Sequence, residues 1–297
     1  MKLQESDLES VPFRSIYSTF VEAFEDYAVN VAAVTEQQFL QRARKNDWQP
    51  QLSSGIEINH ELVAITLIGT DAVDQELIAY DICTGIVPKH RGKGVAGMML
   101  NHIIPRLEDA GVKAIQLEVI QENSAAIRAY QKAGFRTLRG LVGFEANAIA
   151  IRAACWPGRI SPVGLSEVFA LSSSQEYRPS FEQRDRALQA LEQNLMVLGA
   201  FDQDQCIGVI VFDSDSHWLM RLVVQRNRRR MGVASALLHK LSRLLEPGTV
   251  IKAVNIDADD SATIGLVKKC GFSESHDQWE MRLDLTPILH QGFEDLG

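Results

Sequence analysis

The first half of the chain alternates short extended apolar runs with runs of helical periodicity. Three runs rich in β-branched residues predict strands: 56–69, 76–87 and 113–120. Two further runs carry apolar residues at helical spacing and predict helices: Gly92–Leu107 and 124–134. Gly111 and Gly134 follow these helical runs as stop signals. The order of elements is that of a mixed α/β domain.

The second half repeats this pattern. It predicts strands over 196–203, 206–213, 217–224 and 250–256, with a helix before the last of these and another after it. Two landmarks recur in the same order. HRGKGVAGMML, which begins at His90, matches RRRMGVASALL at an offset of 138 (229 − 91), and NSAAIRAYQKAGF matches DSATIGLVKKCGF at an offset of 137 (271 − 134). The pattern indicates a duplicated domain.

Proline and glycine at Pro157, Gly158 and Pro162 mark the junction between the copies. The sequence therefore predicts one domain over 1–153 and a second over 154–297. A chain of 297 residues has room for two such domains, each able to bury its own core.

Composition narrows the possible functions. The net charge of −8 argues against a general nucleic-acid or anionic-membrane binder, in spite of the basic run Arg226–Arg230. The four cysteines are scattered and form no CxxC pair, so neither a zinc site nor a disulfide framework is expected. A polar N-terminus and the lack of an 18-residue apolar run favour a cytoplasmic protein without membrane contact. Its oligomeric state stays open.

The chemistry-bearing stretch is the loop between the strand that ends at Val87 and the helix that follows. A helix start with nearby glycines offers unpaired N–H groups to an anion such as a pyrophosphate. Gly92–Gly97 also matches the pattern GxGxxG of dinucleotide-binding domains. Glu118 lies about where such a domain places the acidic residue that binds the ribose. However, VPKHR separates strand and glycine, and the second copy keeps only Gly232, so this match is weak.

Both copies share the pattern R-x-x-G-x-A, at Arg91–Ala96 and Arg229–Ala234. This pattern, with the downstream N-x-x-A-x-x-x-Y-x-x-x-G-F of the first copy, resembles the GNAT superfamily of acetyl-CoA-dependent N-acetyltransferases. The resemblance covers about residues 60–140 clearly and 200–275 more faintly. It implies two tandem GNAT-like α/β (α+β) domains, each a mixed, mostly antiparallel sheet flanked by helices. It also implies transfer of an acetyl group to a primary amine by direct attack in a ternary complex, without a metal.

The resemblance also implies the roles of particular residues. The cofactor-binding residues would be Ile86 and Val87 along the strand, the loop Arg91, Gly92, Lys93, Gly94, Val95 and Ala96, and Asn123 near the pantetheine arm. Tyr130 matches the tyrosine that protonates the leaving thiolate. Asp81 resembles the strand carboxylate that serves as general base in one branch of the family, although that branch has Glu; Glu118 is the alternative base.

Simple strand alternation predicts Asp81 and Cys83 on one face and Thr84 on the other. The acidic run Phe24–Tyr27 is a candidate acceptor loop, because carboxylates attract cationic amines.

The second copy departs from the pattern at the positions that carry chemistry. Asp81 corresponds to Leu219, Tyr130 to Val267 and Asn123 to Asp260. We therefore expect a catalytic first domain and a degenerate second one. The acceptor, a small-molecule or peptide amine, is not identified by any motif. A non-catalytic acyl-CoA-binding or regulatory module and, more weakly, a dinucleotide-dependent oxidoreductase are the competing hypotheses.

Overall fold

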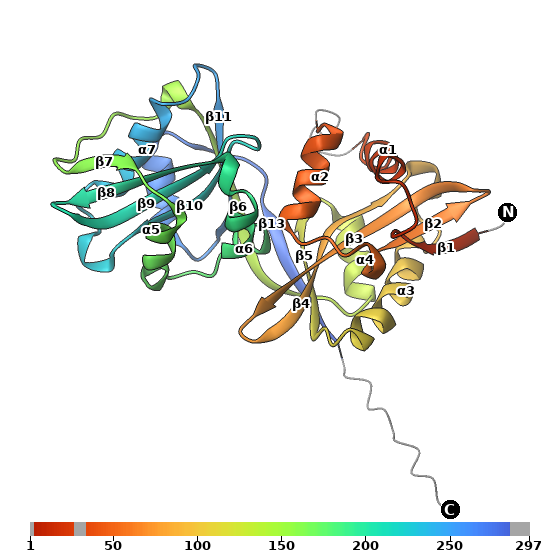
Figure 1. Ribbon diagram of the computed structural model, residues 1–297. Coiled ribbons are helices and arrows are strands. Elements are labelled where there is room, and N and C mark those ends of the chain that lie inside the picture. The colour runs from red at the N-terminus through yellow and green to blue at the C-terminus, as the bar shows by residue number, and fades with distance from the viewer. Residues whose placement is uncertain (1–2, 27–33, 286–297) are drawn as a thin grey trace, which may run out of the picture. The chain divides into compact units, whose positions relative to one another are not determined.

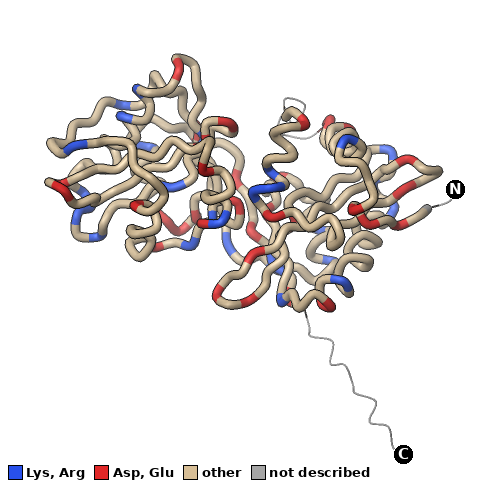
Figure 2. Tube along the Cα trace, viewed as in Figure 1, with Lys and Arg blue, Asp and Glu red and all other residues tan. Residues whose placement is uncertain are grey.

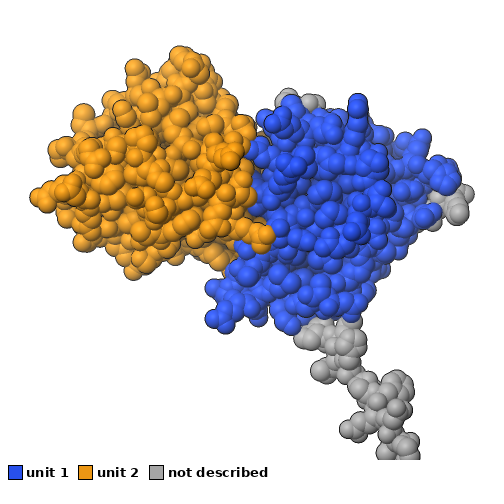
Figure 3. All heavy atoms as spheres, viewed as in Figure 1, with its two compact units in different colours: residues 1–118, 124–136, 281–297 blue, residues 119–123, 137–280 orange. Residues whose placement is uncertain are grey.

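Two mixed α/β units make up the part of the chain that the computed structural model describes, residues 3–26 and 34–285 (Figure 1). Unit 1 contains residues 1–118, 124–136 and 281–297, and unit 2 contains residues 119–123 and 137–280 (Figure 3). Each unit therefore takes a segment from the other half of the sequence.

Unit 1 is built on a sheet in which β1 to β4 are antiparallel neighbours in chain order and β5 is parallel to β4. Its strands are β1 (Leu3–Asp7), β2 (Ser54–Ile58), β3 (Glu61–Val73), β4 (Glu76–Ile86) and β5 (Ala114–Ile120, whose last two residues belong to unit 2). The predicted strand 56–69 is thus two strands, joined at Asn59 and His60, which both have positive φ.

Helices cover this sheet. They are α1 (Phe13–Ala23), α2 (Glu36–Lys45), α3 (Val95–Asp109) and α4 (Ser124–Lys132), with 3₁₀ turns η2 (Pro50–Leu52) and η3 (Pro88–His90). Val95 and Met99 of α3 pack into a cluster with buried residues of β2 and β3. The aromatic side chains of α1 and α2 form a second layer, in which Phe20 stacks on Phe39 with ring centroids 4.1 Å apart.

Unit 2 repeats this order. Its sheet runs β7-β8-β9-β10-β11-β6, and only the β10–β11 pair is parallel. The strands are β7 (Arg159–Pro162), β8 (Leu195–Asp202), β9 (Gln205–Asp213), β10 (Trp218–Val224), β11 (Val250–Asp257) and β6 (Arg136–Asn147), to which β12 (Ser273–Glu274) adds. The helices are α5 (Leu165–Ala170), α6 (Asp185–Ala190), α7 (Val233–Ser242) and α8 (Ser261–Cys270), with 3₁₀ turns η4 (Ala148–Ala150), η5 (Ser172–Ser174), η6 (Phe181–Gln183), η7 (Glu192–Asn194) and η8 (Arg226–Arg228).

The last strand of each repeat is exchanged. β6 follows α4 in the chain, yet beyond Arg136 it belongs to unit 2, where it pairs with β11. β13 (Gln278–Asp284) follows α8, and its residues from Met281 onward belong to unit 1, in which the N–H of Leu285 donates to Lys113 O at 2.8 Å. Each unit is therefore completed by a segment from the other repeat.

Charge is mixed over both units. Figure 2 shows Lys and Arg interspersed with Asp and Glu along the two traces. Across the described residues, no helix has the length and apolar character needed to cross a membrane.

Two glycines near the start of α3 predict opposite effects on stability. Gly94 has φ +77° and Gly97 is helical, and in both cases a Cβ would meet no atom within 4 Å. Gly97→Ala should raise the free energy of unfolding by about 0.5–1 kcal/mol through helix propensity. Gly94→Ala should lower it by about 1 kcal/mol, because an alanine is strained at positive φ. Urea denaturation measures both; equal shifts would contradict the assigned geometry.

Candidate active site

The parallel strands β4 and β5 are joined over only part of their length. Pairing covers Ile78, Ala79 and Tyr80 opposite Ala114, Ile115 and Gln116. Directly beyond it β4 carries a bulge: Ile68 of β3 pairs with Asp81 and Leu67 pairs with Cys83, so Ile82 is the extra residue. A bulge bends its strand and increases the local twist. The two strands therefore diverge from Asp81 onward, and the gap between them opens toward the glycine loop.

Asp81 lies where this divergence begins and is 7% exposed. Its Oδ2 accepts hydrogen bonds from the hydroxyls of Thr84 at 2.7 Å and Tyr130 at 3.1 Å. Burial raises the pKa of the Asp81 carboxyl to about 6, although both hydrogen bonds favour the charged form. The pKa of Tyr130 is raised well above its usual value of 10, first by burial and then by the neighbouring Asp81 charge. A buried carboxyl and a buried phenol, both with raised pKa values, thus share one hydrogen bond.

Thr84 is the residue at this site that the sequence did not predict. Strand alternation placed it on the face opposite Asp81, and that expectation is wrong because the bulge at Ile82 breaks the alternation. Thr84 also shares a hydrogen bond of 3.0 Å with Thr66 of β3. Thr84, one of the two donors to the Asp81 carboxylate, is therefore linked to the neighbouring strand β3.

The other predicted residues lie on β4, on β5 and directly before α4. Glu118 lies half-buried on β5, two residues past the last pair with β4. Asn123 precedes α4, and its backbone N–H donates to Ile120 O at 2.9 Å. Ile86 ends β4, and Val87 is buried directly after it.

The glycine loop runs from η3 into α3, which begins at Val95 and not at Gly92. Gly92 and Gly94 have φ +73° and +77°, and a Cβ at either would meet open space. The backbone N–H groups at the start of a helix have no partner within it, so those following Gly94 are suited to an anion. Lys93 adds positive charge, while its Nζ donates to Lys89 O at 2.8 Å.

Arg91 has a structural contact at each of its guanidinium nitrogens. Its Nε donates to Ile86 O at 3.0 Å, Nη1 donates to Asp26, and Nη2 donates to Asp26 and to Ala23 O, both within 2.8 Å. The side chain therefore ties the loop to the end of α1. Asp26 from the predicted acceptor run is held by this contact, whereas Tyr27 lies outside the described residues.

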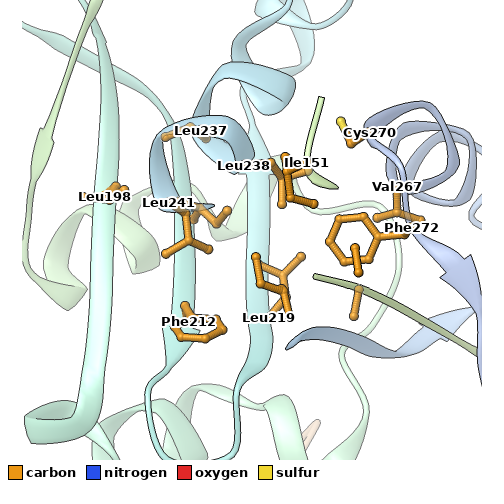
Figure 4. Packing of buried hydrophobic residues seen from close by; sticks show 14 of the residues in the cluster. Ile151, Leu198, Phe212, Leu219, Leu237, Leu238, Leu241, Val267, Cys270 and Phe272 are labelled. Atoms are coloured by element: carbon orange, nitrogen blue, oxygen red, sulfur yellow. The ribbon is translucent and has the colours of Figure 1, made fainter. Parts of the chain in front are cut away.

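The second copy has a diverging strand pair with a bulge like that of the first copy, but it has apolar residues at the positions of Asp81 and Tyr130. β10 pairs with β11 at Trp218 and Lys252 only, and its bulge lies at Met220, 138 residues after Ile82. Leu219 and Val267, at the positions of Asp81 and Tyr130, belong to one buried apolar cluster (Figure 4). Asp260, at the position of Asn123, caps α8 by accepting from the Thr263 N–H at 2.9 Å.

A strand pair that diverges before a glycine turn and a helix, present in both units, is the arrangement of the acetyltransferase fold. The model of the acetyltransferase (GNAT) family matches residues 13–135 and again 165–272. The chain belongs to this family and contains its domain in tandem.

The matched relatives act on different acceptors. Streptothricin acetyltransferase of Streptomyces lavendulae is 32% identical over 75 residues, which cover 25% of this chain and 39% of that protein. The [ribosomal protein bS18]-alanine N-acetyltransferase of Salmonella typhimurium is 31% identical over 104 residues, or 33% of this chain and 70% of that protein. A tandem GNAT protein from the clavulanic acid biosynthesis pathway shares the fold over 96% of this chain and 99% of its own, with a TM-score of 0.72 and 12% identity.

Members of this family use acetyl-CoA as co-substrate. The residues present fit such a group: the glycine loop is open at both positive-φ positions, and Asp81 Oδ1 is a buried oxygen without a hydrogen-bond partner in the described part of the chain. Within residues 3–26 and 34–285, no group of three His, Cys, Asp or Glu side chains is arranged to hold a metal ion.

The raised pKa of Asp81 predicts a cost in stability. Since the folded pKa of about 6 exceeds the usual 3.8, the folded protein binds the proton more tightly, and stability falls as pH rises from about 4 to 6. The total cost is about 3 kcal/mol. Asp81→Asn should therefore raise the free energy of unfolding at pH 8 by about 1–2 kcal/mol, less than the full cost because the new amide N–H₂ is buried unpaired.

Denaturation at pH 4 and at pH 8 measures this difference. At pH 4 the wild-type carboxyl is already protonated, so the gain should disappear. A gain of equal size at both pH values would show that Asp81 titrates in the folded protein as it does in the unfolded chain.

Proposed function

We propose that the first copy, predicted over residues 1–153, transfers the acetyl group of acetyl-CoA to a primary amine by direct attack, and that the second copy, 154–297, does not catalyse the reaction. The observation that carries this proposal is the hydrogen bond between Tyr130 and Asp81, placed where β4 and β5 diverge. Family membership supports acetyl transfer, and η3, which separates β4 from Gly92, disfavours the dinucleotide alternative.

In this proposal the loop and strand bind the co-substrate. The backbone N–H groups from Gly92 to Ala96 hold the pyrophosphate, because the Arg91 N–H already donates to Pro88 O at 3.1 Å. Arg91 fixes the loop through Asp26 rather than contacting phosphate with a free guanidinium. Ile86 and Val87 flank the pantetheine arm, which enters the gap between the diverging strands. This arrangement places the thioester beside Asp81 and Tyr130.

The proton transfers follow from the coupling of these two groups. A neutral amine attacks the thioester carbonyl carbon, the C–N bond forms, and Asp81 takes the proton that the nitrogen must lose. As the C–S bond breaks, Tyr130 gives its proton to the departing sulfur. Asp81 then returns a proton to Tyr130 through their hydrogen bond, so both groups end as they began. The charge on Asp81 raises the pKa of Tyr130, so protonation of Asp81 makes Tyr130 a stronger acid at the moment it is needed.

The acceptor is proposed as a class. By its name, the Salmonella typhimurium relative acetylates an alanine nitrogen, so an amine on a peptide or a small molecule is the class that fits. Glu118, on the neighbouring diverging strand, is the alternative base. Comparison of Asp81→Asn with Glu118→Gln decides between them. Only substitution of the true base should remove the rise of kcat/KM with pH on the acidic side.

Tyr130→Phe tests the acid. We expect kcat to fall by about 10²–10⁴-fold, because only the proton donor is removed, while KM for acetyl-CoA changes by less than about threefold. Thr84→Val is the matched control, since it removes the other hydroxyl that donates to Asp81 Oδ2. Steady-state release of free thiol over an amine panel measures both variants. Similar losses in the two variants would reduce Tyr130 to a positioning residue.

The pH profile tests the base. A carboxylate with a pKa of about 6 predicts that kcat/KM, calculated on the concentration of the neutral amine, rises with unit slope up to about pH 6 and then levels. Thr84→Val should move this limb to higher pH, because one hydrogen bond to the charged form is lost. If kcat/KM of Asp81→Asn still rose over the same pH range as that of the wild type, the titrating group would be another residue.

Gly94→Glu tests the loop. A carboxylate beside the pyrophosphate should weaken acetyl-CoA binding by at least about 100-fold. Gly111→Glu is the matched control: it has φ +79°, open space around its Cβ and a position beyond the loop. It imposes the same strain and charge, and it should bind normally. Isothermal titration calorimetry measures both, and normal binding by Gly94→Glu would show that the loop does not hold the co-substrate.

A further inference from the structure

A buried hydroxyl interrupts the apolar middle of β3. Thr66 stands alone among apolar residues from Leu62 to Ile68, and its side chain is 1% exposed. A hydroxyl taken out of water lowers stability unless it keeps a hydrogen bond. Thr66 lies directly opposite Thr84 in the antiparallel ladder, and their Oγ1 atoms are 3.0 Å apart. Its Oγ1 is also 3.5 Å from Sδ of Met99, a buried residue of α3.

The direction of these hydrogen bonds follows from the number of hydrogens. A threonine hydroxyl carries one hydrogen and can accept others. When Asp81 is charged, Thr84 gives its hydrogen to Oδ2 at 2.7 Å, so the hydrogen between the two threonines comes from Thr66. Hydrogen bonds in such a chain polarise one another. The Thr66 hydroxyl therefore strengthens the hydrogen bond that Thr84 donates to the carboxylate.

The chain can also run in the opposite direction. A protonated carboxyl is a donor and needs an acceptor. The hydroxyls of Thr84 and Tyr130 lie at Oδ2 of Asp81, whereas Oδ1 is buried with no hydrogen-bond partner in the described part of the chain. A proton on Oδ2 is donated to Thr84 if Thr84 turns its own hydrogen to Thr66 and Thr66 turns to the Met99 sulfur. Both hydroxyls only rotate, and neither loses its proton.

The second copy has apolar side chains throughout the corresponding chain. Ile210 lies opposite Leu222 in the β9–β10 ladder, as Thr66 lies opposite Thr84. All of the corresponding residues lie in one buried cluster or pack against it (Figure 4): Ile210, Leu222 and Leu237 for Thr66, Thr84 and Met99, and Leu219 and Val267 for Asp81 and Tyr130. The hydroxyl chain is therefore absent from the copy that also lacks the carboxyl and the phenol.

Other groups also act on the charge of Asp81. Besides the two hydroxyls, the Arg42 charge on α2 and the Cys83 N–H on β4 favour the charged form. Glu118 lies on β5, two residues past its last pair with β4. From residue 62 to residue 70, β3 carries no ionisable side chain. Variants of Thr66 leave all of these groups in place, so a change in the titration of Asp81 in such variants comes from the hydroxyl chain.

We propose that Thr66 is a positioning residue for acetyl transfer: acting through Thr84, it directs hydrogens toward the charged carboxylate and lets them reverse toward Met99 when the carboxyl is protonated. This inference rests on the proposed function, in which Asp81 takes the proton that the amine loses. The reversed chain accepts from the Asp81 carboxyl until Tyr130 has given its own proton to the departing sulfur. Asp81 then returns its proton to Tyr130, and the hydroxyls turn back.

Thr66→Val tests the chain, because valine has nearly the shape of threonine without the hydroxyl. The Asp81 carboxyl of the full chain is titrated directly by ¹³C NMR with labelled aspartate carboxyl groups, and Asp81→Asn assigns its signal. Neither acetyl-CoA nor an amine is needed. The midpoint should move to higher pH by about 0.5, since the charged form loses support. A midpoint equal to that of the wild type would overturn the inference.

Three further variants separate the chain from packing. Thr66→Ser keeps the hydroxyl and should return the midpoint to the wild-type value, whereas a shift as large as that of Thr66→Val would show that packing alone is responsible. Met99→Leu removes the final acceptor at similar volume, so the midpoint should move to lower pH. A move to higher pH, or none, would overturn the reversal. Thr70→Val is the matched control on β3: Thr70 is buried and donates to Asp47 Oδ2 at 3.1 Å, and its loss should leave the Asp81 midpoint unchanged.

Kinetics separates this inference from the proposed function. In Thr66→Val, kcat/KM on the neutral amine should fall about threefold at pH 5 and keep its wild-type value above about pH 7. An NMR midpoint that moves without this kinetic change would overturn Asp81 as the base, and with it the part of Thr66 in the reaction. An acidic limb of kcat/KM that Asp81→Asn removes and Thr66→Val leaves in place would overturn this inference and support the proposed function.

Discussion

The separation of two parallel strands is the constraint on which the rest of the structure depends. β4 leaves β5 after Tyr80 because a bulge at Ile82 turns it away, and β10 leaves β11 in the same manner at Met220. Unpaired strand edges inside a sheet are costly unless another group meets them. The separation thereby creates the site, sets Asp81 at its inner end and directs the glycine turn toward its mouth.

The two copies show which parts of this frame tolerate change. The arginine that ties the turn to an earlier segment and the left-handed glycine before the helix are the same in both. By contrast, the polar contact between Asp81 and Tyr130 is replaced in unit 2 by apolar packing of Leu219 and Val267 (Figure 4). A buried carboxylate with a raised pKa opposes folding, so a leucine at the corresponding position of the second copy avoids this cost in the free energy of folding.

The sequence predicted the frame because repetition, strand periodicity and glycine spacing are local properties. The sequence also named Asp81 and Tyr130 as candidate residues, and the fold brings these two side chains within hydrogen-bond distance. It missed Thr84, since a bulge is a mismatch between two strands and neither strand reveals it alone. The partner of the Arg91 guanidinium was also missed, because Asp26 lies 65 residues away in the chain and no local pattern relates the two residues. β6 escaped prediction because exposed and buried residues do not alternate along it: Arg136 and Thr137 are both exposed, and the next three residues are all half-buried.

The exchange of final strands has a consequence for synthesis on the ribosome. Residues from Met281 onward belong to unit 1, although the remainder of that unit ends at Arg136. A nascent chain therefore exposes an incomplete first sheet while more than a hundred further residues are translated. The second repeat must be made in full before the first can close. A chain truncated before Met281 would therefore lose a segment of unit 1, and damage at the end of the second repeat would reach the earlier half of the protein.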